Sequence, residues 1–370
     1  MAGSQVKSAS PIAALLLAAA RLELDRVDPG LAILAQAAPA KGLLDAAAHH
    51  RLSAPLYLML REAGGLTEQI AAPLAQRYRV GAVWQLRLAS ELVRLGQALG
   101  DQDIDWVTFK GPTLSEVYYP RPDLRSYADL DVMVRPSQAR QAFALLLDMG
   151  GSPITGGWEE IRTEGVAQAS VRLPGGAVVD LHWHPFSLRR VHEAFPFDPD
   201  GLIDRRTRAT LKPGEVWTLS HEDTLLHLCA HTCFSGGTHL VWFTDIDRVV
   251  HNPRVMDWDL IASRARSARL ALIAATMLER ARQLLGTPVP NPALDGMAPR
   301  YGWRRVMLAA EAVRPLPNTT SGRVTGELLV LSTLDSSATS IRELARKSWF
   351  DLLVPLTRDP QHPWRQRVGV

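Results

Sequence analysis

Two aspartates separated by one residue, Asp129 and Asp131, are the side chains whose spacing most directly indicates chemistry. They lie in the run ADLDVMV, whose aliphatic residues predict a β-strand. Side chains two residues apart in a strand share a face, so both carboxylates project together while Leu130 and Val132 point the other way. Like charges this close repel, and a hard divalent cation such as Mg²⁺ relieves the repulsion by binding oxygen ligands. On this basis, Asp131→Asn should melt at the wild-type temperature or slightly higher.

A third carboxylate, Asp180, interrupts the apolar run AVVDL. A lone aspartate in such a strand is unfavourable unless it is paired or bound to a metal. If this strand lies beside the strand of Asp129 and Asp131, the three carboxylates converge, a set suited to two metal ions about 4 Å apart. An Asp-x-Asp pair also occurs at strand ends and turns without any metal, so the hypothesis depends on its neighbours.

Support for the metal-site hypothesis comes from Lys110 and Gly111, which end a short predicted strand that starts at Asp105. Pro112 suits the first position of a following helix. A helix start offers free backbone N–H groups and lysine adds a positive charge, so both residues are predicted to bind nucleotide phosphates. The alternative for Lys110 is an exposed residue at a strand end.

The elements that would position these residues form an α+β fold that is mostly helical. Apolar spacing predicts helices from residue 11 to about 98, with ranges 12–24, 31–38, 43–60 and 82–99. Residues 104–185 are predicted to form a β-α-β-α-β-β unit, a small mixed sheet with helices on one face. Helices are predicted again beyond residue 218, in ranges 220–233, 241–250, 258–268, 270–285 and, as a group, 303–356.

Composition excludes several classes of protein. The chain has 370 residues and a formal net charge of +3, and its arginines are scattered, so we expect no nucleic-acid partner. The only two cysteines, Cys229 and Cys233, favour a reducing compartment. No run reaches the ~18 apolar residues of a membrane span. The apolar run at 11–20 resembles the core of a signal peptide but lacks a cleavage site, so we expect a cytoplasmic protein.

The run KGPTLSEVYYP from Lys110, followed by RSYADLD from Arg125, resembles the family named "uncharacterised nucleotidyltransferase". This family belongs to the DNA polymerase β-like superfamily, whose pattern has a glycine at a helix start, an Asp-x-Asp pair and a third carboxylate. Gly111, Asp129, Asp131 and Asp180 stand at those positions. Segments 50–56, 219–231 and 240–246 extend the resemblance over about residues 12–290.

The resemblance implies an enzyme that transfers NMP from an NTP to a hydroxyl or phosphate group of a small molecule or peptide and releases pyrophosphate. ATP is the expected nucleotide, and two Mg²⁺ or Mn²⁺ ions are expected at Asp129, Asp131 and Asp180. The implied domains are an N-terminal helical region (1–98), the nucleotidyltransferase core (99–188), a helical substrate-side domain (189–290) and a C-terminal helical region (291–370).

The sequence departs from the superfamily pattern at Pro112, where glycine or serine is usual. A hydroxyl for the phosphates is therefore expected from Thr113 or Ser115. The long insertion before Asp129 contains Arg125, which we interpret as a phosphate contact; the alternative is a loop arginine that pairs with Asp123 or a helix end.

Two further residues are substrate-side candidates. His182 belongs to the family-like run DLHW and could position the substrate. Asp245 lies on a predicted apolar helix, where it could touch the substrate, orient a basic residue, or form a salt bridge between helices, for example with Arg248.

Two other functions stay open. The chain could be a catalytically silent nucleotide-binding module, which Pro112 would suit. It could also be a metal hydrolase that uses the His182-x-His184 pair with His227 and His231. The hydrolase would require a barrel of about eight strand–helix units, and residues 1–98 show no convincing strand.

Overall fold

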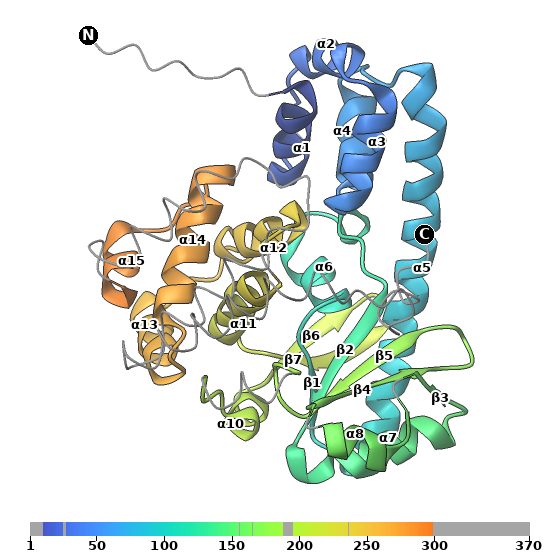
Figure 1. The fold of residues 1–370 in the computed structure, drawn as a ribbon, viewed down its shortest axis with the longest axis vertical. Helices are drawn as coiled ribbons and strands as arrows, with labels where there is room; N and C mark the ends of the chain where they lie inside the picture. The colour runs from blue at the N-terminus through green and yellow to red at the C-terminus, as the bar shows by residue number, and fades with distance from the viewer. Residues whose placement is uncertain are drawn as a thin grey trace, which may run out of the picture.

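The computed structural model describes residues 10–298 except 25–26, 155, 165, 188–194 and 236. Within this part, a seven-stranded mixed sheet has the order β3-β4-β5-β2-β1-β7-β6 (Figure 1). Its strands are β1 (Trp106–Thr108), β2 (Asp129–Val134), β3 (Ser152–Pro153), β4 (Gln168–Arg172), β5 (Val178–His182), β6 (Thr207–Leu211) and β7 (Gly214–Thr218). The β2–β5 and β1–β7 pairs are parallel, and the other neighbours are antiparallel.

The four predicted strands correspond to β1, β2, β4 and β5, so the α+β class is confirmed. The sheet is larger than predicted, because the β6–β7 hairpin lies within the range 189–290 that the sequence suggested was helical. Its signal was the Pro213-Gly214 turn between two short runs in which buried and exposed residues alternate. The predicted domain limits stay a prediction, but the hairpin belongs to the central sheet.

The α-helices described before the sheet are α1 (Pro11–Arg21), α2 (Gly30–Ala37), α3 (Ala40–His49), α4 (Ser53–Glu62) and α5 (Glu68–Asp101). The single helix predicted for 43–60 is therefore two helices, and Arg51 adopts a positive φ of 56° between them. The helix predicted from residue 82 begins at Glu68 and spans 34 residues.

Helix α10 (Pro199–Asp204) lies between β5 and β6, and the described helices after β7 are α11 (His221–Phe234), α12 (Leu240–Val250), α13 (Trp258–Ser267), α14 (Ala271–Leu285) and α15 (Asn291–Met297). Ser220 caps α11 as predicted, with its Oγ accepting a hydrogen bond from the Asp223 backbone N–H at 3.2 Å. The helices predicted for 303–356 lie outside the described residues.

Helices cover both faces of the sheet, which corrects the prediction of helices on one face. On one face, Leu130 and Val132 are fully buried in a core that includes residues of α5 and α7 (Ala139–Asp148). On the other face, Val107 and Met133 belong to a core that includes α11 and α12. Figure 1 shows α11 and α12 beside the sheet, with α6 (Pro112–Tyr118) close by. The second face carries the candidate site.

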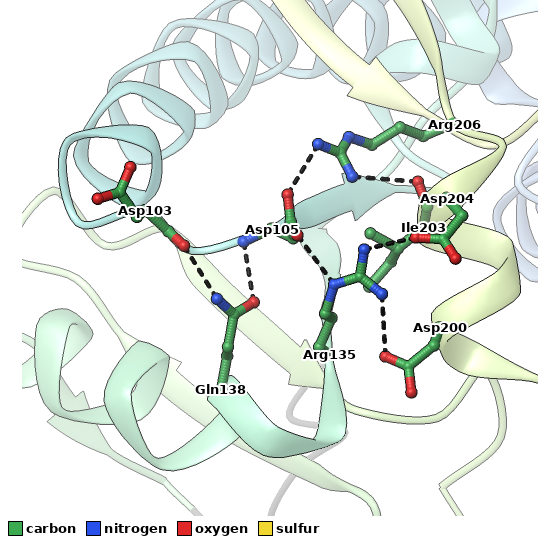
Figure 2. Close-up of polar contacts among 8 residues, drawn as sticks. All are labelled: Asp103, Asp105, Arg135, Gln138, Asp200, Ile203, Asp204 and Arg206. Carbon is green, nitrogen blue, oxygen red and sulfur yellow. Dashed lines mark hydrogen bonds and ion pairs between the residues drawn. The ribbon is translucent and has the colours of Figure 1, made fainter.

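A cluster of ion pairs at the end of β2 holds α10 and the start of the β6–β7 hairpin against β1 and β2 (Figure 2). The guanidinium of Arg135 pairs with Asp105 at 2.8 Å and with two carboxylates of α10, Asp200 and Asp204, at 3.2 and 2.5 Å. Arg206 donates to the other oxygen of Asp105 at 2.8 Å. These ion pairs join α10 to the start of β1 and to the end of β2. They lie at the opposite end of β2 from Asp129.

Candidate functional site

The three predicted carboxylates meet on one face of the sheet. The parallel pairing of β2 with β5 places Asp131 directly beside Asp180, and Asp129 is two residues earlier on β2. Because side chains alternate along a strand, all three carboxylates share the face opposite Leu130 and Val132. The sequence predicted this convergence on the condition that the two strands were neighbours, and the register satisfies that condition.

These carboxylates open into a pocket of about 290 Å³. The pocket is lined by Phe109, Lys110, Asp129, Asp131, Gln168, Asp180, His182, Pro185, Phe186, Ser187, His227, His231, Phe234 and Ser235. The charged lining residues come from β2, from β5 and from Lys110 after β1, whereas the aromatic lining residues, here called the aromatic wall, come from the end of β1, the segment after β5, and α11. No pattern in the sequence singled out Gln168, Phe186 or Phe234.

Asp131 is the most strongly held carboxylate of the pocket. Its Oδ1 lies 3.0 Å from the ammonium of Lys110, and only 7% of its side chain is exposed. Burial opposes ionisation, but the Lys110 charge and then the His182 ring outweigh it and hold the pKa of Asp131 well below its usual range. Lys110 thus offsets the repulsion between the aspartates, so the prediction that Asp131→Asn keeps or raises the melting temperature needs correction.

The pKa of Asp129 is shifted in the opposite direction. Burial, followed by the negative charge of Asp131, raises the pKa of Asp129 to about 6, against the lowering effect of Lys110. Near neutral pH this carboxylate is mainly ionised but can still take up a proton. The site therefore joins one firmly ionised carboxylate to one that can exchange a proton.

The His182 side chain completes a set of atoms suited to a divalent ion. Ligand atoms of Asp131, Asp180 and His182 all lie within 4.8 Å of one another. His182 Nε2 is 3.4 Å from Asp131 Oδ1, and neither ring nitrogen of this buried side chain has a hydrogen-bond partner among the described residues. Two carboxylates and an unpartnered imidazole fit a metal ion chemically. Asp180 also accepts a short hydrogen bond from the hydroxyl of Ser170.

Of the predicted phosphate contacts around Gly111, only Lys110 reaches the pocket wall. Gly111 has φ 60° and ψ −124°, and a Cβ there would lie 3.4 Å from the carbonyl oxygen of Asp129. Glycine is required because the loop passes close to β2 in a conformation that other residues avoid. Thr113 is buried, and its hydroxyl donates to the Lys110 carbonyl at 3.1 Å, so it stabilises the turn.

Arg125 and Asp245 pair with each other and do not line the pocket. The Arg125 guanidinium contacts both carboxylate oxygens of Asp245, at 2.6 and 2.9 Å, and both side chains are buried. Tyr119 donates a further hydrogen bond to Asp245 at 2.6 Å. This ion pair joins the loop before β2 to α12. The phosphate contact expected of Arg125 and the substrate contact expected of Asp245 stay predictions.

The histidines do not form the arrangement that a barrel hydrolase would need. Within the described residues the sheet is open, with β3 and β6 at its edges. His184 lies outside the pocket lining, and its Nδ1 accepts the Phe186 backbone N–H at 3.2 Å. His227 and His231 line the aromatic wall; burial, then Lys110, lowers the pKa of His227 to about 3 and keeps it neutral.

The family model described as "Uncharacterised nucleotidyltransferase" matches residues 36–286, more than half of the chain, and the protein belongs to this family. Among solved structures, an antigenic nucleotidyltransferase-like protein from Paracoccidioides brasiliensis aligns at 15% identity and a TM-score of 0.36, over 58% of this chain and 97% of that one. The antibiotic-resistance factor ANT(2'')-Ia aligns at 13% identity and a TM-score of 0.28, over 54% and 90%. No curated protein matches the chain.

None of the helices in the described part of the chain combines the length and apolar character needed to cross a bilayer.

Proposed function

We propose that the protein transfers NMP from an NTP, ATP in the first instance, to a hydroxyl or phosphate oxygen of a small molecule or peptide. The observation that carries the proposal is the convergence of Asp129, Asp131 and Asp180 beside Lys110 in one pocket. Family membership supports the same reaction class.

Asp129, Asp131 and Asp180 would hold divalent Mg²⁺ or Mn²⁺, which supplies charge neutralisation for the triphosphate and lowers the pKa of the acceptor group. Lys110 is the only lysine or arginine among the described lining residues, so it would attract the phosphates. A bond forms between the acceptor oxygen and the α-phosphorus as the bond to pyrophosphate breaks. The acceptor proton passes to a carboxylate, and we assign this role to Asp180.

The aromatic wall would bind the apolar part of the second substrate. Phe109, Phe186 and Phe234 line the same pocket as the carboxylates, and the His227 ring lies 4.7 and 6.2 Å from the ring centres of Phe109 and Phe186. Such walls bind flat or apolar groups and exclude water from the reacting atoms. We infer an acceptor that carries an aromatic or apolar group beside its hydroxyl.

The test is pyrophosphate release with each of the four NTPs, in the presence of Mg²⁺ or Mn²⁺ and a panel of small-molecule and peptide acceptors. Wild type should release pyrophosphate, and Asp180→Asn should reduce release by orders of magnitude. Asp45→Asn is the matched control, because Asp45 pairs with Lys41 on the exposed surface of α3. Release that is equal in wild type and Asp180→Asn would contradict the proposal.

A catalytically silent nucleotide-binding module is the second candidate, and the Lys110–Asp131 ion pair favours it. This pair already compensates one buried carboxylate without a metal ion. Calorimetry with ATP combined with the pyrophosphate assay distinguishes the two functions, because both bind the nucleotide but a silent module releases no pyrophosphate with any acceptor.

A further inference from the structure

We infer that His182 is a direct ligand of the divalent ion together with Asp131 and Asp180, so that the site prefers a first-row transition ion to Mg²⁺. The inference deepens the proposed function and rests on it for the presence of a metal ion. It departs from a site made only of carboxylates, which the sequence predicted.

The first argument is that the nitrogens of the buried His182 ring lack hydrogen-bond partners among the described residues. His182 is only 6% exposed, and both ring nitrogens are without a hydrogen-bond partner in the part of the chain that the structure describes. Buried polar groups in native proteins are almost always satisfied, so both His182 nitrogens are available to a ligand. The His227 ring is in the same state among the described residues, but only His182 lies in the cluster of ligand atoms with Asp131 and Asp180. Phe109 fixes the ring by an edge contact with centroids 5.1 Å apart.

The second argument is the distance between His182 Nε2 and Asp131 Oδ1, which is 3.4 Å. Two atoms that each lie about 2.1 Å from one ion, at angles between about 90° and 110°, are separated by about 3.0–3.5 Å. The observed distance matches two ligands of a single ion. It exceeds the usual N–H···O hydrogen-bond distance of about 2.9 Å. Asp180 adds a third ligand atom within 4.8 Å of the other two.

The third argument is charge. When ionised, Asp129, Asp131 and Asp180 carry three negative charges, and Lys110 supplies one positive charge within the same pocket wall. The remaining two negative charges equal the charge of one divalent ion. A neutral imidazole adds a strong ligand without changing this balance.

The preference for a transition ion follows from the ligand type. Mg²⁺ binds oxygen and keeps its waters, whereas imidazole nitrogen favours first-row transition ions. We take Mn²⁺ as the probe, because it accepts carboxylate oxygens and its unpaired electrons report a directly bonded nitrogen.

The experiment measures Mn²⁺ binding to the nucleotide-free protein by electron paramagnetic resonance, with Mg²⁺ as competitor, and records electron spin-echo modulation from ¹⁴N. Wild type should show nitrogen modulation and bind Mn²⁺ more tightly than Mg²⁺. His182→Gln should abolish the modulation and weaken Mn²⁺ binding at least about tenfold, with a smaller change for Mg²⁺. His227→Gln is the matched control, because His227 is a buried, unpartnered histidine of the same pocket that lies outside the cluster of ligand atoms; it should keep the modulation.

Oxygen-only surroundings for Mn²⁺, an unchanged signal in His182→Gln, or no Mn²⁺ binding at millimolar concentration would each overturn the inference. If His182→Gln fails to fold, the wild-type spectrum still decides, and Asp180→Asn reports whether the nitrogen-coupled ion lies in this pocket by weakening its binding. The outcome is separable from the proposed function. An oxygen-only Mn²⁺ site with pyrophosphate release refutes the inference alone, and a nitrogen-coupled site without release refutes the function alone.

Discussion

At the scale of single residues, Asp129 and Asp131 differ although their spacing makes them look equivalent. Asp131 is held by Lys110 at 3.0 Å, whereas Asp129 is buried beside the charge of Asp131. One carboxylate therefore stabilises the fold when ionised and the other destabilises it. Substitution of each should shift stability in opposite directions, which gives a paired test.

Asp131→Asn should lower the melting temperature of the metal-free protein at pH 7. The pKa of Asp131 is lowered in the fold, so its ionised form contributes stability above the unfolded value near 3.9, and that contribution is lost as pH falls through the folded value. Thermal melts in chelator from pH 3 to pH 8 should therefore show a deficit at neutral pH that shrinks in acid. A variant as stable as wild type at pH 7 would restore the prediction made from the sequence.

Asp129→Asn should raise the melting temperature at pH 7. The folded pKa of about 6 exceeds the unfolded value near 3.9, so wild type loses stability as pH rises from about 4 to 6 and keeps that deficit above 6. Asparagine removes the ionisation, and the gain should disappear below about pH 4. The same chelator-treated melts measure it, and a gain that persists at pH 3 would assign the effect to something other than this carboxylate.

At the scale of elements, the Arg125–Asp245 ion pair holds the loop before β2 against α12. Exposure of these side chains is 8% and 1%, so neither charge can be hydrated if its partner is lost. Gln85 of α5 donates to the Arg125 carbonyl at 2.8 Å and extends the connection to a third element. The pair therefore positions β2, and with it Asp129 and Asp131.

Asp245→Asn should lower the free energy of unfolding by about 3–5 kcal/mol, because it leaves the Arg125 charge buried without its partner. The double variant Arg125→Met with Asp245→Leu should recover much of this loss, since neither charge remains. Urea denaturation of the three proteins measures both effects. A double variant that is no more stable than Asp245→Asn would show that the side chains are not coupled.

At the scale of the whole molecule, α5 connects the N-terminal helices with the sheet (Figure 1). Ile70 and Leu74 near its start belong to the core formed with α1, α3 and α4, while Leu88 and Leu92 belong to the core of the sheet. One continuous helix therefore fixes the N-terminal region relative to the strand that carries the carboxylates.

Gly96→Ala tests this connection, because a Cβ at Gly96 would lie 2.3 Å from the Trp106 ring of β1. The ring is buried, so the clash must displace β1 or α5, and we expect a loss of about 1–3 kcal/mol. Gly81→Ala is the control in the same helix, where no atom lies within 4 Å; alanine there should stabilise by up to about 1 kcal/mol. If both variants change the free energy of unfolding equally in denaturant titrations, Gly96 of α5 is not tightly packed against Trp106 of β1.

The order of the amino acids specified the local features that depend on short spacing. The period-two pattern placed Asp129 and Asp131 on one face of a strand, and Ser220 marked the start of α11. The same reasoning identified Asp180 as a carboxylate that needed a partner. These features follow from backbone geometry over a few residues, which the amino-acid order specifies directly.

Which side chains share an environment depends on the packing of distant segments and could not be predicted from local patterns. Asp245 lies 120 positions from Arg125, and no local pattern shows that the two neutralise each other instead of facing the pocket. Burial and neighbouring charge, which set the sign of each pKa shift, likewise depend on packing. Lys110 therefore reversed the expected effect of Asp131→Asn, and the parallel register of β2 with β5 decided that Asp180 and His182 lie beside Asp131.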